Sequence, residues 1–318
     1  MITARALVQT FHTRQGRTKV DVEAVKGVDL DVAEGEIVSF LGPNGAGKTT
    51  TLRMLTTLLR PTSGTATVAG HDVSTDPVAV RRSIGYVSQS GSTSSVARAG
   101  EELMDHGMLY GIDRARAERR GRELFEQLSL DGLWDRQPKS LSGGQRRRLD
   151  IAMGLIHDPG LIFLDEPTTG LDPQARVNLW QHIGDLRDRR GATIFLTTHY
   201  LDEADALSDR VIVIDNGVII AADTPDRLKQ QVSGDLVDLE LADGDQVPLA
   251  AKQLAAHGDV ETDGRHVRTR MPRAGTVIPA VLRDLEAEGI TLSHIEIRRP
   301  TLDDVFLTLT GRSLREEA

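Results

Sequence analysis

Cysteine is absent from this chain of 318 residues. Disulfide bonds and thiol chemistry are therefore excluded. Long hydrophobic runs are also absent, because stretches such as Leu161–Leu164 and Val211–Ile214 are far too short to cross a bilayer. The chain has no excess of positive charge either. Its formal net charge of −9 at pH 7 argues against a surface for nucleic acid or anionic membranes.

The N-terminus lacks the pattern of a secretory signal, since Met1–Arg5 leads directly into alternating sequence. With the short hydrophobic runs, this predicts a soluble protein in the cytoplasm. An apolar content of 39% is enough to build real cores. The length allows one large α/β domain plus a small one, or two medium ones.

Residues 1–40 alternate between apolar and polar side chains in the manner of β-strands. Turns are indicated near Arg14–Thr18 and at Ala33–Glu36, so this segment predicts a twisted antiparallel layer. A helical pattern rich in charge then covers about Val96–Leu128. Its Arg114–Arg122 run is more typical of a solvated helix face than of an anion site.

Strand and helix patterns alternate in the middle of the chain. Leu161–Leu164 and Thr193–Leu196 have the composition of strands, and a helical stretch over Pro173–Arg189 lies between them. This order predicts a parallel sheet with a right-handed crossover. Further on, Asn216-Gly217 between two apolar runs indicates a β-hairpin.

The pattern changes near Gly234, after a helix that Thr224 and Pro225 are predicted to start. Beyond this point the predicted elements follow the order βαββαβ, which fits a small two-layer α/β module. No catalytic constellation occurs within the module, so we expect it to bind or regulate. The predicted domains are residues 1–230, with a helical subdomain at about 90–158, and residues 235–318.

The most informative motif is a glycine-rich phosphate cradle of the form G-x-x-x-x-G-K-T, placed between the apolar run Ile37–Leu41 and a helical pattern over Thr50–Leu59. Its glycines let backbone N–H groups turn toward phosphate oxygens, and the next helix adds the positive end of its dipole. In such a motif Lys48 reaches the β- and γ-phosphates, and the Thr49 hydroxyl ligates Mg²⁺. The predicted ATP-binding residues here are Gly42, Pro43, Asn44, Gly45, Ala46, Gly47, Lys48, Thr49 and Thr50.

Two carboxylates follow the buried strand predicted at Leu161–Leu164. The carboxyl ends of strands are where α/β sheets present their ligand sites. We expect Asp165 to hold Mg²⁺ through its water shell and Glu166 to act as the general base toward the γ-phosphate. The alternative, a pair that only caps a turn, is less favoured in a chain with a phosphate cradle.

A second glycine turn precedes a helix at Leu141-Ser142-Gly143-Gly144-Gln145. Ser142 is also a typical helix N-cap. Because a glycine turn at a helix N-terminus is a ready anion site, the chain carries two phosphate-binding surfaces.

With these motifs the sequence resembles the nucleotide-binding subunit of an ATP-binding-cassette (ABC) transporter, in which L-S-G-G-Q is the family signature. The resemblance covers roughly residues 1–230, because several motifs occur in the family's order. It implies a P-loop NTPase fold of ABC type, with a parallel sheet core, an antiparallel β layer and a helical subdomain. It also implies an ATPase that uses ATP and Mg²⁺.

The resemblance assigns roles to further residues. Gln89 matches a loop glutamine that touches Mg²⁺ and senses the transmembrane partner. His199 matches a switch histidine at the γ-phosphate, which gives a catalytic set of Glu166, His199 and Lys48. The loop that couples two sites across a dimer corresponds to Gly170, Leu171 and Asp172.

Phe11 lies where the family places an aromatic that stacks on adenine, but a core or surface role is nearly as well supported. The family arrangement also implies a head-to-tail homodimer. In it, the cradle of one copy and Leu141–Gln145 of the other sandwich one ATP, so that neither half-site is complete alone. Hydrolysis would then let the dimer open.

The ending Ile297–Leu307 and the segments Arg81–Ile84 and Arg146–Asp150 are similar to the daunorubicin/doxorubicin-resistance branch of bacterial exporters. Gln145 and His199 instead follow the broader family. The branch resemblance implies a separate integral membrane permease, export of a drug, antibiotic or lipid-like substrate, and a place at the cytoplasmic face of the cell membrane.

Two alternatives stay open. One is a soluble ABC ATPase that acts on a ribosomal or DNA-repair assembly, although two cassettes in one chain, long coiled-coil inserts and a basic face are not evident. No nucleic-acid partner is therefore expected. The other is an importer ATPase with a regulatory tail, which the terminal motif disfavours.

Overall fold

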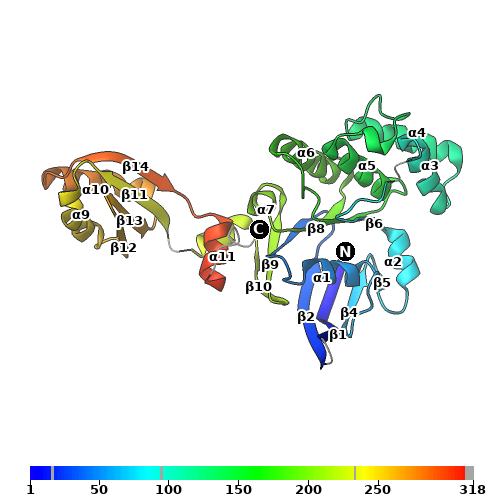
Figure 1. Ribbon diagram of the computed structural model, residues 1–318, viewed down its shortest axis with the longest axis horizontal. Coiled ribbons are helices and arrows are strands. Elements are labelled where there is room, and N and C mark those ends of the chain that lie inside the picture. Colours follow the sequence, from blue (N-terminus) through cyan, green and yellow to red (C-terminus); the bar gives the residue numbers. More distant parts are fainter. Residues whose placement is uncertain (16–17, 94–95, 233, 312–318) are drawn as a thin grey trace. The chain divides into compact units, whose positions relative to one another are not determined.

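The computed structural model describes residues 1–15, 18–93, 96–232 and 234–311 of the chain (Figure 1). It contains two compact units, one over Met1–Pro225 and one that begins at Asp226. Among the described residues, no helix combines the length and the hydropathy that a membrane span requires.

An antiparallel sheet opens the first unit. Its strands, in spatial order, are β2 (Thr18–Val32), β1 (Ile2–Gln15), β4 (Ser63–Val68) and β5 (His71–Asp72). β1 pairs with β2 from Ile2 opposite Val32 to Gln15 opposite Thr18. The antiparallel layer predicted from residues 1–40 is therefore present over β1 and β2, but residues 37–40 belong to a strand of the parallel sheet instead. Residues 16–17 of the predicted turn lie outside the described residues.

A mostly parallel sheet forms the centre of the first unit. Its strands, in spatial order, are β10 (Val218–Asp223), β9 (Arg210–Asp215), β3 (Ile37–Leu41), β8 (Thr193–Thr198), β7 (Leu161–Asp165) and β6 (Ile84–Val87). Only β10, at one edge, runs antiparallel to its neighbour among these described strands. The hairpin before it turns at Asn216 and Gly217, whose φ angles of 48° and 82° are those that a type I′ turn requires.

Helices cover both faces of this sheet. They are α1 (Lys48–Leu55), α2 (Pro77–Ser83), α3 (Ala99–Leu109), α4 (Arg114–Gln127), the 3₁₀ turn η1 (Pro138–Ser140), α5 (Gly143–Leu155), α6 (Pro173–Arg190) and α7 (Leu201–Leu207). The prediction of a helix over Thr50–Leu59 was wrong at both ends. The helix begins at Lys48 and ends at Leu55, because Thr57 adopts a left-handed φ of 62° that breaks the helical hydrogen-bond pattern.

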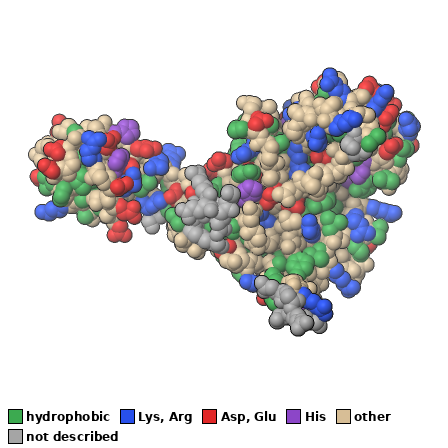
Figure 2. Space-filling model, viewed as in Figure 1, with side chains coloured by type: hydrophobic (Ala, Val, Ile, Leu, Met, Phe, Trp, Pro, Cys, Tyr) green, Lys and Arg blue, Asp and Glu red, His purple; other side chains and the backbone are tan. Residues whose placement is uncertain are grey.

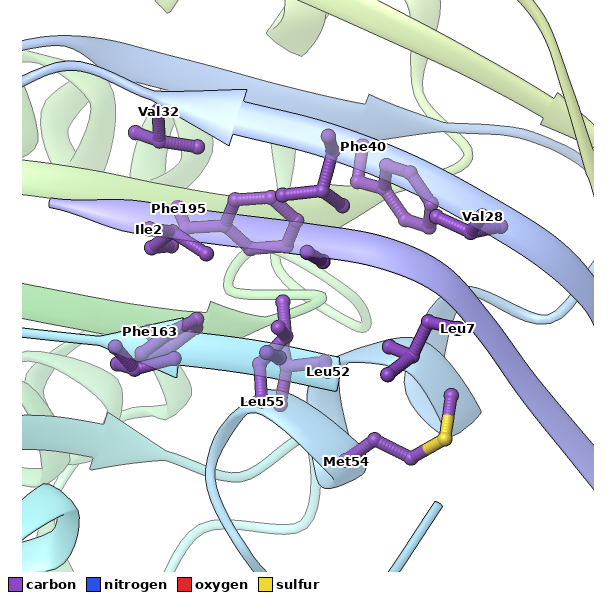
Figure 3. Close-up of a cluster of buried hydrophobic side chains, with 14 of the residues drawn as sticks. Ile2, Leu7, Val28, Val32, Phe40, Leu52, Met54, Leu55, Phe163 and Phe195 are labelled. Atoms are coloured by element: carbon purple, nitrogen blue, oxygen red, sulfur yellow. The ribbon is translucent and has the colours of Figure 1, made fainter. Parts of the chain in front are cut away.

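Side chains that alternate along the central strands build two cores. On one face Phe163 of β7 lies with Phe40 of β3 and Phe195 of β8, packed against Leu52 and Leu55 of α1 (Figure 3). On the other face Ile162 and Leu164 pack under the helices α3, α4, α5 and α6, which lie together on that side of the sheet (Figure 1). Strands buried on both faces explain why these runs are continuously apolar.

The arginine-rich helix α4 turns most of its charge outward. Arg114, Arg116, Arg119 and Arg122 are exposed, whereas Leu124 and Phe125 are buried. Figure 2 shows Lys and Arg side chains at the surface over this end of the first unit. The solvated face predicted for the run is confirmed.

The second unit is a small two-layer module. Its elements are α8 (Pro225–Gln230), β11 (Asp235–Leu241), the 3₁₀ turn η2 (Gly244–Gln246), α9 (Val247–Leu254), β12 (Val260–Asp263), β13 (His266–Met271), α10 (Ala274–Ala287), β14 (Leu292–Arg298) and α11 (Leu302–Thr310). The antiparallel sheet has the order β12-β13-β11-β14, and its core includes Leu239, Val267 and Leu285. The predicted βαββαβ order is present from β11 to β14.

Candidate nucleotide-binding site

The cradle lies at the carboxyl end of β3 and leads into α1. At Gly47, φ is 103° and an added Cβ would lie 2.6 Å from the carbonyl oxygen of Ala24. At Gly42, an added Cβ would lie 2.2 Å from the carbonyl oxygen of Ile214. Only glycine fits these two positions, because a side chain would collide with neighbouring backbone. The loop is therefore held against β2 and β9 in one shape.

Lys48, the first residue of α1, is 4% exposed. Its Nζ atom donates hydrogen bonds to the carbonyl oxygens of Gly42, at 2.7 Å, and Pro43, at 3.0 Å. Burial lowers the pKa of Lys48, and the carboxylates of Glu166 and Asp165 oppose that shift. The ammonium group is thus placed inside the loop, where a bound phosphate chain would meet it.

Thr49 and Asp165 meet below the cradle. The Thr49 hydroxyl donates to Asp165 Oδ1 at 3.1 Å, and the Thr197 hydroxyl donates to the same oxygen at 2.7 Å. A hydroxyl and a carboxylate suit Mg²⁺, which takes one or two protein ligands and completes its shell with water and phosphate oxygens. Among the described residues, no cluster of three or more His, Asp or Glu side chains could hold a metal ion alone. The donor set therefore fits Mg²⁺ brought together with a nucleotide.

Glu166 occupies a crowded polar pocket and is 8% exposed. Its Oε1 lies 3.4 Å from His199 Nδ1 and 3.6 Å from Lys48 Nζ. Its Oε2 accepts hydrogen bonds from Gln89 Nε2, at 2.8 Å, and the Thr169 hydroxyl, at 3.1 Å. Burial raises the pKa of Glu166, but His199, Lys48 and Thr169 together outweigh it, so the net pKa is lowered. The carboxyl is therefore ionised at neutral pH, as a base must be.

The second glycine turn caps α5. The Ser142 hydroxyl accepts a hydrogen bond from the Gln145 amide at 3.3 Å, and Gln145 Oε1 accepts one from the Ser142 amide at 3.0 Å. This reciprocal pair is a capping box. Leu141 is buried, whereas Ser142 and Gly143 are exposed, so the N-terminus of α5 is open to a ligand. In the described part of the chain, no hydrogen bond or ion pair joins this turn to the cradle.

The sequence profile of the ABC transporter family matches residues 25–169, which include the cradle, the signature and the Asp165-Glu166 pair. A second profile, "ATP-binding protein DrrA1-3-like, C-terminal domain", matches residues 224–310. The daunorubicin resistance ATP-binding protein DrrA2 of Streptomyces coeruleorubidus is 45% identical over 292 residues, which are 91% of this chain and 90% of that protein. This chain belongs to the ABC transporter family.

Other similar proteins agree. The doxorubicin resistance ATP-binding protein DrrA of Mycobacterium tuberculosis is 40% identical over 92% of this ABC protein and 90% of its own length. The linearmycin resistance ATP-binding protein LnrL of Bacillus subtilis is 33% identical over 92% of this chain and 95% of its own length. These similarities confirm the predicted branch of the family.

Solved structures support the same fold. A dimeric ATP-binding cassette in a post-hydrolysis state, bound to ADP and Pi, has a TM-score of 0.63 and 26% identity, over 70% of this chain and 98% of that one. The predicted P-loop fold of ABC type is confirmed. As an ABC cassette, this chain binds ATP.

The structure brings most of the predicted site residues of this ABC protein together. Lys48, Gln89 and His199 all surround Glu166. Gln89 donates to the predicted base, and among the described residues no hydrogen bond joins Gln89 to Thr49 or to Asp165. The segment predicted to couple two sites follows Glu166, with Gly170 at a φ of 78° and Asp172 as the N-cap of α6.

The side chain of Phe11 lies at the surface of the first unit. Phe11 is 40% exposed on β1, so a core role is excluded and adenine stacking stays a prediction.

Two threonines of the site were not predicted from the sequence. Thr169 contacts Glu166, and Thr197 contacts Asp165. Their only sequence signal is a hydroxyl residue close to the end of a buried strand, which many strands carry for other reasons.

Proposed function

We propose that this ABC protein hydrolyses ATP and thereby energises export of a drug, antibiotic or lipid-like substrate through an integral membrane permease on a separate chain. The setting of Glu166 supports hydrolysis most strongly, because this buried, ionised carboxylate contacts Gln89 and Thr169 beside the cradle lysine. The relatives named for resistance to daunorubicin, doxorubicin and linearmycin support export. They favour it over action on ribosomes or DNA and over import.

Each group has a proposed role. Glu166 takes a proton from the attacking water. Lys48 and His199 stabilise negative charge on the γ-phosphate. Thr49, Asp165 and Gln89 would hold Mg²⁺, which supplies charge neutralisation on the phosphate oxygens when bound. The remaining cradle residues orient the nucleotide.

We further propose that ATP joins two copies of the chain head to tail. The open N-terminus of α5, with Leu141–Gln145, would meet the γ-phosphate held by the cradle of the partner. The separation of signature and cradle within one chain supports this, as do the dimeric cassettes of similar fold. Residues 1–230 would form the nucleotide-binding domain at the cytoplasmic face of the membrane. Residues 235–318 would form the accessory domain.

Glu166→Gln tests the proposed chemistry. The amide keeps the shape of the side chain but cannot take a proton, so phosphate release should fall by roughly 10²–10⁴-fold while ATP still binds. Phosphate release and equilibrium binding of ATP are the two measurements. Glu123→Gln, on the exposed face of α4, is the matched control and should leave both unchanged. Wild-type turnover by Glu166→Gln would contradict the assignment of the base.

A further inference from the structure

One arginine of the signature helix is buried. Arg147 of α5 is 6% exposed, whereas its neighbour Arg146 is exposed to solvent. Burial lowers the pKa of Arg147, and the nearby carboxylates of Asp150 and Asp165 oppose that shift. A buried guanidinium is costly unless its donors are satisfied, so its partners indicate why it is there.

Its hydrogen bonds enclose the predicted base. Arg147 Nη2 donates to the carbonyl oxygen of Asp165 at 3.0 Å, and Nε donates to that of Pro167 at 2.8 Å. These carbonyls belong to the residues immediately before and after Glu166. The guanidinium therefore fixes the main chain on both sides of the residue that carries the catalytic carboxylate.

A third donor of Arg147 contacts the loop over Ser88–Ser92 that carries Gln89, here called the glutamine loop. Arg147 Nη1 donates to the carbonyl oxygen of Ser88 at 2.5 Å, directly before Gln89. The same carbonyl accepts a hydrogen bond from the Gly91 amide at 3.2 Å, which closes a turn around Gln89. The side chain of Gln89 in turn donates to Glu166. One guanidinium thus holds both segments whose side chains meet at the base.

Asp150, one helical turn further along α5, holds the other end of this loop. It is 3% exposed, and its Oδ1 accepts a hydrogen bond from the Ser92 amide at 2.9 Å. Gly91 has a φ of 74°, and a Cβ there would lie 2.7 Å from Asp150 Oδ2. The loop is therefore packed directly onto the carboxylate. α5 therefore contacts the glutamine loop at two points, through Arg147 at Ser88 and through Asp150 at Ser92.

The backbone at the base needs such support. Glu166 has a φ of 43°, in the left-handed region that is unfavourable for a residue with a side chain. A strained conformation persists only where its surroundings fix it. The Glu166 amide is held by Thr197, and Arg147 holds the carbonyls on both sides.

We propose that Arg147 is a positioning residue for ATP hydrolysis, which links the signature helix α5 to Glu166 and Gln89. Asp150 completes the link by fixing the loop after Gln89. This inference rests on the proposed role of Glu166 as the base. When the signature of α5 engages ATP on the partner copy, a displacement of the helix is transmitted directly to the base of its own site.

Arg147→Lys tests the link. Lysine keeps the positive charge, but its single ammonium group cannot reproduce the planar guanidinium, which donates to three separate carbonyl oxygens. Misplacement of the base should lower kcat by roughly 10²-fold, with KM for ATP unchanged because the cradle is untouched. The matched control is Arg146→Lys, which should keep wild-type kcat.

A double variant separates positioning from general stability. If Arg147 acts through Glu166, adding Arg147→Lys to Glu166→Gln should cause no further fall in single-turnover phosphate release. A full additional fall in that background, or a wild-type kcat in Arg147→Lys alone, would overturn the proposal. Activity of Glu166→Gln at the wild-type rate would instead overturn the proposed base, so the two failures are distinguishable.

A second variant covers the case in which Arg147→Lys does not fold. Asp150→Asn keeps the size of the side chain and an acceptor for the Ser92 amide, but it removes the charge that faces Arg147. It should lower kcat less than Arg147→Lys does, again with KM for ATP unchanged. A wild-type kcat in folded Asp150→Asn would show that Asp150 is no part of the link, and a rise in KM alone would contradict positioning.

Discussion

Whether a buried titratable side chain in this protein carries a charge depends on the partners around it. Lys48 and Glu166 are both nearly inaccessible and lie 3.6 Å apart, so each offsets part of the other's desolvation. Removing either one would leave the other charge buried with fewer partners. His157, in contrast, is a partly buried side chain that its burial keeps neutral at pH 7. Its Nε2 lies 2.9 Å from the carbonyl oxygen of Ile84 and its ring stacks on Tyr110 at 3.8 Å. The carboxylate of Asp158 raises the pKa of His157 by less than burial lowers it.

His157 should make stability depend on pH. Burial lowers its pKa to about 4 in the folded protein. Between its ordinary value and about 4, the unfolded state binds more protons than the folded state, so stability falls as pH falls through this window. His157→Gln should reduce the drop in thermal midpoint between pH 7 and pH 4. His294→Gln, on the exposed edge strand β14, is the control. An equal pH dependence in wild type and His157→Gln would contradict this account.

Motif chemistry predicted which residues would contact phosphate and metal, but it did not predict the residues that support them. Lys48, Asp165 and Glu166 are recognisable because each chemistry needs that residue type at that spacing. Arg147 lies in a run of three arginines that look alike in sequence. Which of them is buried depends on how α5 is rotated against the central sheet, and tertiary packing sets that rotation rather than the arginine run itself.

At the scale of elements, tight packing around Trp134 joins α3 to α4. A Cβ at Gly100 of α3 would lie 2.1 Å from Trp134 Cε2, and one at Gly121 of α4 would lie 2.9 Å from Cη2. The indole also packs edge-on against Phe125 and lies under the Arg122 guanidinium. Glycine is needed here to make room for the indole, since both positions lie in regular helix.

Gly100→Ala should therefore destabilise the protein by about 1–3 kcal/mol through overpacking. Gly184 of α6 provides the matched comparison, because an added Cβ there meets nothing within 4 Å. Gly184→Ala should stabilise the protein by up to about 1 kcal/mol through helix propensity. Urea unfolding of both variants measures the difference. Equal effects of the two substitutions would show that the Trp134 contact is unimportant.

Long, periodic elements could be predicted, whereas several short ones could not. The helices α2 and α7 span only seven residues each, too few to establish a helical period. α11 was missed although Thr301 and Asp304 form a capping box at its start. That signal was present in the sequence, but the segment was interpreted only as a family motif.

At the scale of the whole molecule, strand order had to come from the structure. The sequence predicts a parallel sheet, but the central place of β3 between β8 and β9 depends on pairings between residues far apart in the chain. That order places the cradle after β3, the two carboxylates at the end of β7 and His199 after β8, all at the carboxyl ends of parallel strands. The second unit has its own sheet and core, with the order β12-β13-β11-β14.

The association with a membrane permease is the most direct test of the proposed export function. Tagged Glu166→Gln protein, produced in its own cells, would be purified from detergent-solubilised membranes with ATP present, so that the ATP-bound state accumulates. The matched control is the same protein with Lys48→Ala added, which removes the cradle lysine. We predict that an integral membrane permease is retained with Glu166→Gln. Retention of ribosomal or DNA-repair components, with no membrane protein, would contradict the export account.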